Sequence, residues 1–140
     1  GLPGMVVLQF AFNEDNDAHP YLPENHPENG VAYLGTHDNN TTRGWLEAEL
    51  DAAARERLAR FVALDDDPAG DVAALLDLLM ASPARTAIAC AQDLLALPAG
   101  ARMNTPGLPA GNWDWQRTSP QYETLPLEPL AAMAAAHGRR

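Results

Sequence analysis

Three short apolar runs most strongly constrain the fold of this chain. They are "MVVLQF" at Met5–Phe10, "VAYL" at Val31–Leu34 and "TAIAC" at Thr86–Cys90. Each run is nearly apolar on both faces, which is typical of strands that are buried on both sides, as in a parallel sheet. We therefore expect three strands, although the alanines of the third run also favour helix.

Helical patterns follow the strands. Apolar residues recur at steps of three or four over 45–62, which predicts an amphipathic helix that ends before Pro68. A second helix is predicted over 72–80 with Asp71 as its N-cap, and a third over 129–137. Strands that alternate with helices indicate parallel βα units and an α/β fold.

Three parallel strands cannot close a barrel, and alone they leave two bare sheet edges. The chain also begins with Gly1-Leu2-Pro3-Gly4, without an initiator methionine. We therefore expect residues 1–140 to be the C-terminal part of a single TIM (β/α)8 catalytic barrel, about three βα units that correspond to strands six to eight. The remainder of that barrel is then its expected structural partner.

Composition excludes several classes of partner. The chain has 19 acidic and 9 basic residues, a net charge of −10, which would repel nucleic acid and anionic membranes. No apolar run approaches the roughly 20 residues of a membrane span. The single cysteine, Cys90, cannot form an internal disulfide and fits a reducing compartment, so we expect a cytoplasmic protein. A neutral ligand such as a sugar meets no electrostatic objection.

Polar residues follow each predicted strand. His37 and Asp38 come two residues after the second strand, Gln92-Asp93 follows the third, and Asn13-Glu14 follows the first. Because the loops after barrel strands converge on the catalytic face, these residues are candidates for a site. The alternative for Asp38 is a purely structural role, in which its carboxylate caps the next helix.

Four ordered segments resemble a known family: "GLPGMVVLQFAF", "YLGTHDNNTTRGW", "AQDLLAL" and "ARMNTPGLPAGNWDW". Together they are similar to the C-terminal third of bacterial amylomaltases, the 4-alpha-glucanotransferases. The resemblance implies an α-amylase-like barrel that transfers α-1,4-glucan segments between maltooligosaccharides by a retaining double displacement, without a cofactor. It implies that Asp38 is the third, stabilising catalytic carboxylate and that His37 binds sugar hydroxyls.

The resemblance also implies further contacts and some departures. Asn104 is the next candidate for substrate binding, and Asn13 is a weaker one because the family often has an acidic residue there. Ala96 stands where a glycine is expected, and Gln116 stands where an arginine is expected. No residue matches the nucleophile or the general acid/base, so we expect the isolated chain to be inactive.

Other readings of the same residues stay open. The chain is alternatively a non-catalytic α-glucan-binding or scaffold module, or part of a hydrolase of the same clan. For the three tryptophans, at positions 45, 113 and 115, we favour packing over sugar stacking. A metal site built from His19, His26, His37 and Asp38 fits no ligand spacing, and we expect no bound metal.

Overall fold

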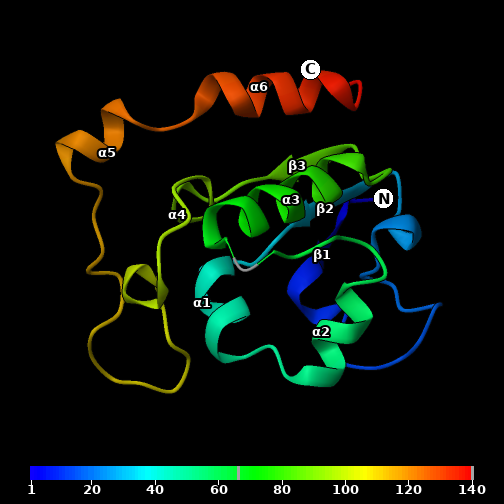
Figure 1. Ribbon diagram of the computed structural model, residues 1–140, viewed down its shortest axis with the longest axis horizontal. Helices are drawn as coiled ribbons and strands as arrows, with labels where there is room; N and C mark the ends of the chain where they lie inside the picture. The colour runs from blue at the N-terminus through cyan, green and yellow to red at the C-terminus, as the bar shows by residue number, and fades with distance from the viewer. Residues whose placement is uncertain (66, 140) are drawn as a thin grey trace.

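Three parallel strands form the centre of the computed structural model, which describes residues 1–65 and 67–139. The strands are β1 (Gly4–Val7), β2 (Gly30–Tyr33) and β3 (Thr86–Ile88), in the order β1-β2-β3. The middle strand is β2 (Figure 1), and in the register of the sheet Met5 pairs with Val31, which pairs with Thr86. The predicted parallel α/β arrangement is therefore confirmed, and the carboxyl ends of all three strands lie at the same edge.

Helices and 3-10 turns lie between the strands and after the last strand. They are η1 (Leu8–Phe10), η2 (Pro23–Asn25), α1 (Thr42–Ala48), α2 (Ala52–Leu58), α3 (Pro68–Ala81), α4 (Ala91–Leu94), η3 (Ala99–Ala101), α5 (Ser119–Glu123) and α6 (Leu127–Ala136). The last helix, shown in red in Figure 1, lies close to the prediction. Within the described ranges, no helix combines the length and the apolar character that crossing a bilayer requires.

The first and third strands are shorter than predicted. The first ends at Val7, and the chain then turns into η1, where both Leu8 and Gln9 are buried. The Gln9 side chain donates a hydrogen bond from Nε2 to the main-chain oxygen of Asn40 (3.2 Å). An extended strand would have placed these neighbouring side chains on opposite faces, so the turn is what allows both to be buried.

The helix predicted over 45–62 is two helices. Asp51 separates them because its Oδ1 accepts a hydrogen bond from the main-chain N–H of Ala54 (2.7 Å) and so caps α2. The apolar period continues through this break, since buried Leu46 and Leu58 belong to the same core cluster. Periodicity alone therefore concealed the boundary.

The predicted cap of the next helix is also wrong. Asp67 caps α3, with its carboxylate accepting from the N–H groups of Ala69 and Gly70, and Pro68 is the first helical residue. Asp71 lies one turn further on, buried, and accepts a hydrogen bond from the N–H of Asp65 (3.0 Å). Aspartate is a favourable N-cap residue at either position. Proline is favoured at the first helical position, so Pro68 places the start of α3 directly after Asp67.

The core lies on one face of the sheet. Val6 and Ala32, which are paired neighbours, belong to one buried cluster with Leu75 and Leu79 of α3. On the opposite face, Met5 is 56% exposed and Ile88 is 39% exposed. Parallel sheets usually have both faces covered, so this uncovered apolar surface is unusual for a complete domain.

A buried carboxylate joins α4 to α1. Asp93 is 5% exposed, and its Oδ1 accepts a hydrogen bond from the main-chain N–H of Thr42 at the start of α1 (2.8 Å). Burial raises the pKa of Asp93 above its ordinary value of 3.8, and the hydrogen bond from Thr42 opposes that shift to a smaller extent. Asp93 therefore joins two helices, and its burial destabilises the charged form relative to that of a solvent-exposed aspartate.

This environment predicts how Asp93 affects stability. Because the folded chain holds the Asp93 proton more tightly than the unfolded chain, its contribution is greatest below pH 3.8 and falls as pH rises through the raised pKa. Asp93→Asn keeps an acceptor for Thr42 without the charge, and should be at least as stable as wild type at pH 7. Asp93→Ala should lose about 1–3 kcal/mol.

Urea unfolding followed by circular dichroism, at pH values between 3 and 7, measures both effects. The matched control is Asp114→Asn, at an exposed aspartate. An Asp93→Asn variant that is clearly less stable than wild type at pH 7 would contradict the proposed cost of the buried charge.

Candidate active site

Two loops that are distant in sequence meet at the carboxyl edge of the sheet. The first, residues 35–41, follows β2, and the second, residues 102–104, follows η3. The main-chain N–H of Asn104 donates to the main-chain oxygen of His37 (3.0 Å). Asn39 shapes the first loop from within, because its Oδ1 accepts from the N–H of Thr36 (2.9 Å) and from its hydroxyl (3.0 Å).

The Asp38 carboxylate lies at the junction of the two loops. Its Oδ1 accepts a hydrogen bond from Asn104 Nδ2 (2.5 Å) and is 3.3 Å from His37 Nε2. The side chains of Asp38 and His37 are about half exposed. Three of the four residues predicted for the site are therefore brought together, although Asn104 is 66 positions away from Asp38 in the chain.

The alternative helix-capping role of Asp38 is wrong. Thr41 is the N-cap of α1, and its hydroxyl accepts from the N–H of Gly44 (3.1 Å). Among the described hydrogen bonds, the Asp38 carboxylate bonds to Asn104 rather than to α1. A carboxylate that is half exposed and fixed by an amide is available to a ligand.

Asn13 lies apart from this group. It is exposed beyond η1, and it does not line the cavity that opens next to His37 at the carboxyl edge of the sheet. Its neighbour Glu14 lies 3.7 Å from the His19 ring. A role for Asn13 in substrate binding stays a prediction.

The histidines considered for a metal site are held separately. His26 is buried, and its Nε2 is 2.9 Å from the main-chain oxygen of Tyr21, whereas His19 contacts Glu14. Desolvation by burial lowers the pKa of His26. Within residues 1–65 and 67–139, no three His, Cys, Asp or Glu side chains are placed to share a metal ion.

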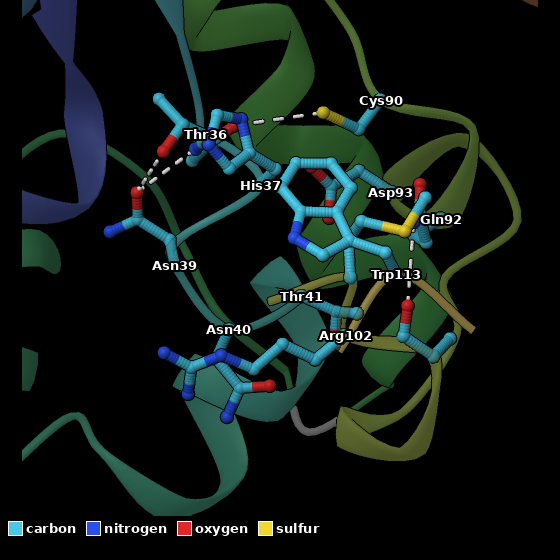
Figure 2. Close-up of a pocket in the computed structure, with 13 residues that line it drawn as sticks. Thr36, His37, Asn39, Asn40, Thr41, Cys90, Gln92, Asp93, Arg102 and Trp113 are labelled. Carbon is cyan, nitrogen blue, oxygen red and sulfur yellow. Dashed lines mark hydrogen bonds between the residues drawn. The ribbon is translucent and has the colours of Figure 1, made fainter. Parts of the chain in front are cut away.

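A hollow of about 190 Å³ opens beside His37. Residues from both loops, from the start of α4 and from the segment after the second loop line it, among them Thr36, Gln92, Arg102 and Trp113 (Figure 2). Complete ligand pockets are usually about 300 Å³ or larger, so this hollow accommodates only part of an oligomeric ligand. Burial raises the pKa of the Cys90 thiol in its wall to about 11, so this sulfur is neutral.

Trp45 and Trp113 differ in their burial. Trp45 is buried in the core, as predicted. Trp113 is 60% exposed, and its ring centroid lies 4.9 Å from that of His37. Its backbone has a φ of 65°, in the left-handed region, and its N–H donates to the main-chain oxygen of Met103 (2.7 Å). Trp113 therefore packs against His37 in the wall of the site rather than in the core.

Arg102 is a further site residue that sequence reasoning missed. Its Nη2 donates to the main-chain oxygen of Asp38 (2.7 Å), and its Nε donates to the main-chain oxygen of Asn104 (2.8 Å). No local pattern marks it, because the contact with Asp38 spans 64 positions. The sequence feature that could have identified Arg102 is its position in the same motif as Asn104, two residues before it.

The glycine expected at position 96 has a structural reason. Ala96, which stands where a glycine is expected, has a φ of 46°, a left-handed conformation that glycine adopts without the steric cost of a Cβ. Nothing in the structure explains Gln116, which is exposed.

Comparison with known proteins identifies the family of this chain. The family model described as 4-alpha-glucanotransferase matches residues 1–121. The chain is 44% identical to a 4-alpha-glucanotransferase of Thermus thermophilus and 41% identical to one of Streptococcus pneumoniae. In both cases the match covers 99% of this chain, but only 29% and 27% of the relative.

A solved structure gives the same result. The amylomaltase of Streptococcus agalactiae in complex with acarbose superposes with a TM-score of 0.89 at 32% identity, over 99% of this chain and 28% of that protein. The chain thus spans about a quarter of the length of the relatives it matches. With a family model that matches most of its residues, the chain belongs to the 4-alpha-glucanotransferase family.

Proposed function

We propose that this chain supplies the transition-state-stabilising aspartate, Asp38, of a 4-alpha-glucanotransferase that moves α-1,4-glucan segments between maltooligosaccharides. The observation that supports this most strongly is the position of the Asp38 carboxylate. It is half exposed at the carboxyl edge of a parallel sheet and is held by Asn104 and His37. In TIM-barrel enzymes, the active site lies at this edge of the strands.

The chemistry of glycosyl transfer needs such a group. The transition state resembles an oxocarbenium ion, so positive charge develops on the sugar ring. A fixed carboxylate stabilises that charge more than it stabilises the neutral ground state, and the difference accelerates the reaction. His37 and Asn104 supply nitrogen groups beside the carboxylate for the sugar hydroxyls.

The sheet supports the placement of this chain within a larger (β/α)8 barrel, and we propose that its strands are strands six to eight of that barrel. The face that carries Met5 and Ile88 is apolar and partly open, and further strands would cover it. The chain spans about a quarter of its matched relatives, which leaves length for the other βα units.

The retaining double displacement also requires a nucleophile and a general acid/base. We assign both to the remainder of the barrel, because the loop carboxylates here are poorly suited. Asp93 is buried against Thr42, and Glu14 lies beside His19. The cytoplasmic location and the preference for transfer over hydrolysis stay predictions.

One observation favours the alternative, a non-catalytic glucan-binding module. The exposed ring of Trp113 beside the hollow is suited to stacking on a pyranose ring. Isothermal titration of the chain with maltoheptaose tests it, and binding without any transfer activity in the longer protein would favour the module.

Replacing Asp38 tests the proposed catalytic role. In the longer protein that carries this chain, Asp38→Asn should lower kcat about 10²–10³-fold, because the amide has no charge to stabilise the cationic ring. KM should change little, since the amide still accepts and donates hydrogen bonds. Steady-state kinetics with maltotriose measures both constants.

The matched control is Asp17→Asn, an exposed aspartate between η1 and η2, outside the two site loops, whose described hydrogen bond uses its main-chain oxygen. It should leave kcat unchanged. Wild-type turnover by Asp38→Asn would overturn the proposed function.

The isolated chain of 140 residues should not transfer glucose units by itself. Without a nucleophile, no glycosyl-enzyme intermediate forms. Incubation with maltotriose, followed by chromatography of the sugars, should show maltotriose alone. New, longer maltooligosaccharides would contradict the division of catalytic groups proposed above.

A further inference from the structure

We propose that Arg102 is a positioning residue, which together with Glu49 fixes the orientation of the Asp38 carboxylate for catalysis. This inference rests on the proposed function of Asp38. In this proposal, Arg102 does not contact the sugar directly. It acts through the backbone of the two site loops.

Arg102 completes a closed ring of hydrogen bonds. Its Nη2 donates to the main-chain oxygen of Asp38 (2.7 Å), and its Nε donates to that of Asn104 (2.8 Å). Asn104 in turn donates from Nδ2 to Asp38 Oδ1 (2.5 Å). One guanidinium therefore fixes the backbone of both partners of the bond that orients the carboxylate.

This ring also distinguishes the two oxygens of the carboxylate. The described contacts of the Asp38 carboxylate, from Asn104 and from the His37 ring, are both to Oδ1. Since Oδ1 is occupied by side chains of the site, we assign Oδ2 to the reacting sugar. A rotation of the Asp38 or Asn104 backbone would misdirect that oxygen.

Glu49 anchors Arg102 to a helix. Its Oε1 lies 3.6 Å from Arg102 Nη1 and accepts a hydrogen bond from Asn40 Nδ2 (2.8 Å). Glu49 is the C-cap residue of α1, so the guanidinium is held against a fixed element rather than against a free loop. Asn40 belongs to the same loop as Asp38, which gives that loop a second attachment.

The Arg102–Glu49 pair contributes little to stability by itself. The two side chains are 24% and 45% exposed, and exposed ion pairs are typically worth less than about 1 kcal/mol. The Glu49 carboxylate has an electrostatic consequence instead. It offsets the guanidinium charge near a ring that becomes cationic, where an uncompensated positive charge would oppose the reaction.

An arginine is specifically suited to this position. Its planar guanidinium presents several N–H groups in a fixed geometry, so one side chain reaches two carbonyl oxygens and a carboxylate together. A lysine keeps the charge but concentrates its donors on one nitrogen. Arg102→Lys is therefore the conservative variant that separates charge from geometry.

The experiment uses Arg102→Ala and Arg102→Lys in the longer protein that carries this chain. Because small displacements of catalytic groups cost about 10²-fold, Arg102→Ala should lower kcat by about that factor and leave KM within about twofold. Arg102→Lys should lie between the wild type and Arg102→Ala.

The matched control is Arg55→Ala. Arg55 also donates to a main-chain oxygen, that of Leu46 (2.9 Å), but Leu46 is a buried core residue of α1. Arg55→Ala should lower the melting temperature to a similar extent as Arg102→Ala with kcat unchanged. Equal losses of kcat in the two variants would show that Arg102 acts through general stability, and would overturn the inference.

Two further readouts separate positioning from binding. Hydrogen exchange of the Asn104 main-chain N–H, which donates to His37, should be faster in Arg102→Ala. The double variant Arg102→Ala/Asn104→Ala should lose less than the product of the single losses, because both disturb one ring of bonds. A raised KM with unchanged kcat would assign Arg102 to substrate binding and overturn the positioning role.

The Asp38→Asn variant distinguishes this inference from the proposed function. Collapse of kcat in Asp38→Asn, with wild-type kcat in both Arg102 variants, overturns the inference alone. Wild-type kcat in Asp38→Asn overturns the proposed function as well.

Discussion

The parallel pairing of three strands is the constraint on which the rest of this structure depends. Because β1, β2 and β3 run in one direction, their carboxyl ends lie at one edge, where the loop after β2 meets the segment 102–104 that follows η3. This brings Asn104 against Asp38 across 66 positions of sequence. The hydrogen bond between them therefore results from the sheet topology and from the contact of the second loop with the first. Local structure does not produce it.

The parts of this fold that could be predicted are those determined by local physics. Apolar runs identified the strands, and proximity to a strand end identified His37 and Asp38. The predicted ends of helices and strands were wrong where a single polar side chain determines whether the helix or strand continues or stops. Asp51 begins a new helix within a continuous apolar period, and buried Gln9 follows a strand that has already turned.

The contacts that could not be predicted are non-local. Arg102 reaches Asp38 only because the second loop folds over the first. Trp113 takes a left-handed backbone conformation that places its ring beside His37, and no propensity scale indicates that for a tryptophan. The family resemblance identified the segment that holds both residues, whereas their roles required the three-dimensional arrangement.

The central claim is that the Asp38 carboxylate faces the sugar ring at which charge develops. A crystal structure of the longer protein with a maltooligosaccharide bound tests it most directly. The account predicts Asp38 Oδ2 within about 3 Å of a sugar hydroxyl at the reacting ring, with Oδ1 still bound to Asn104. A carboxylate turned away from the bound sugar, with the ring placed elsewhere in the barrel, would contradict it.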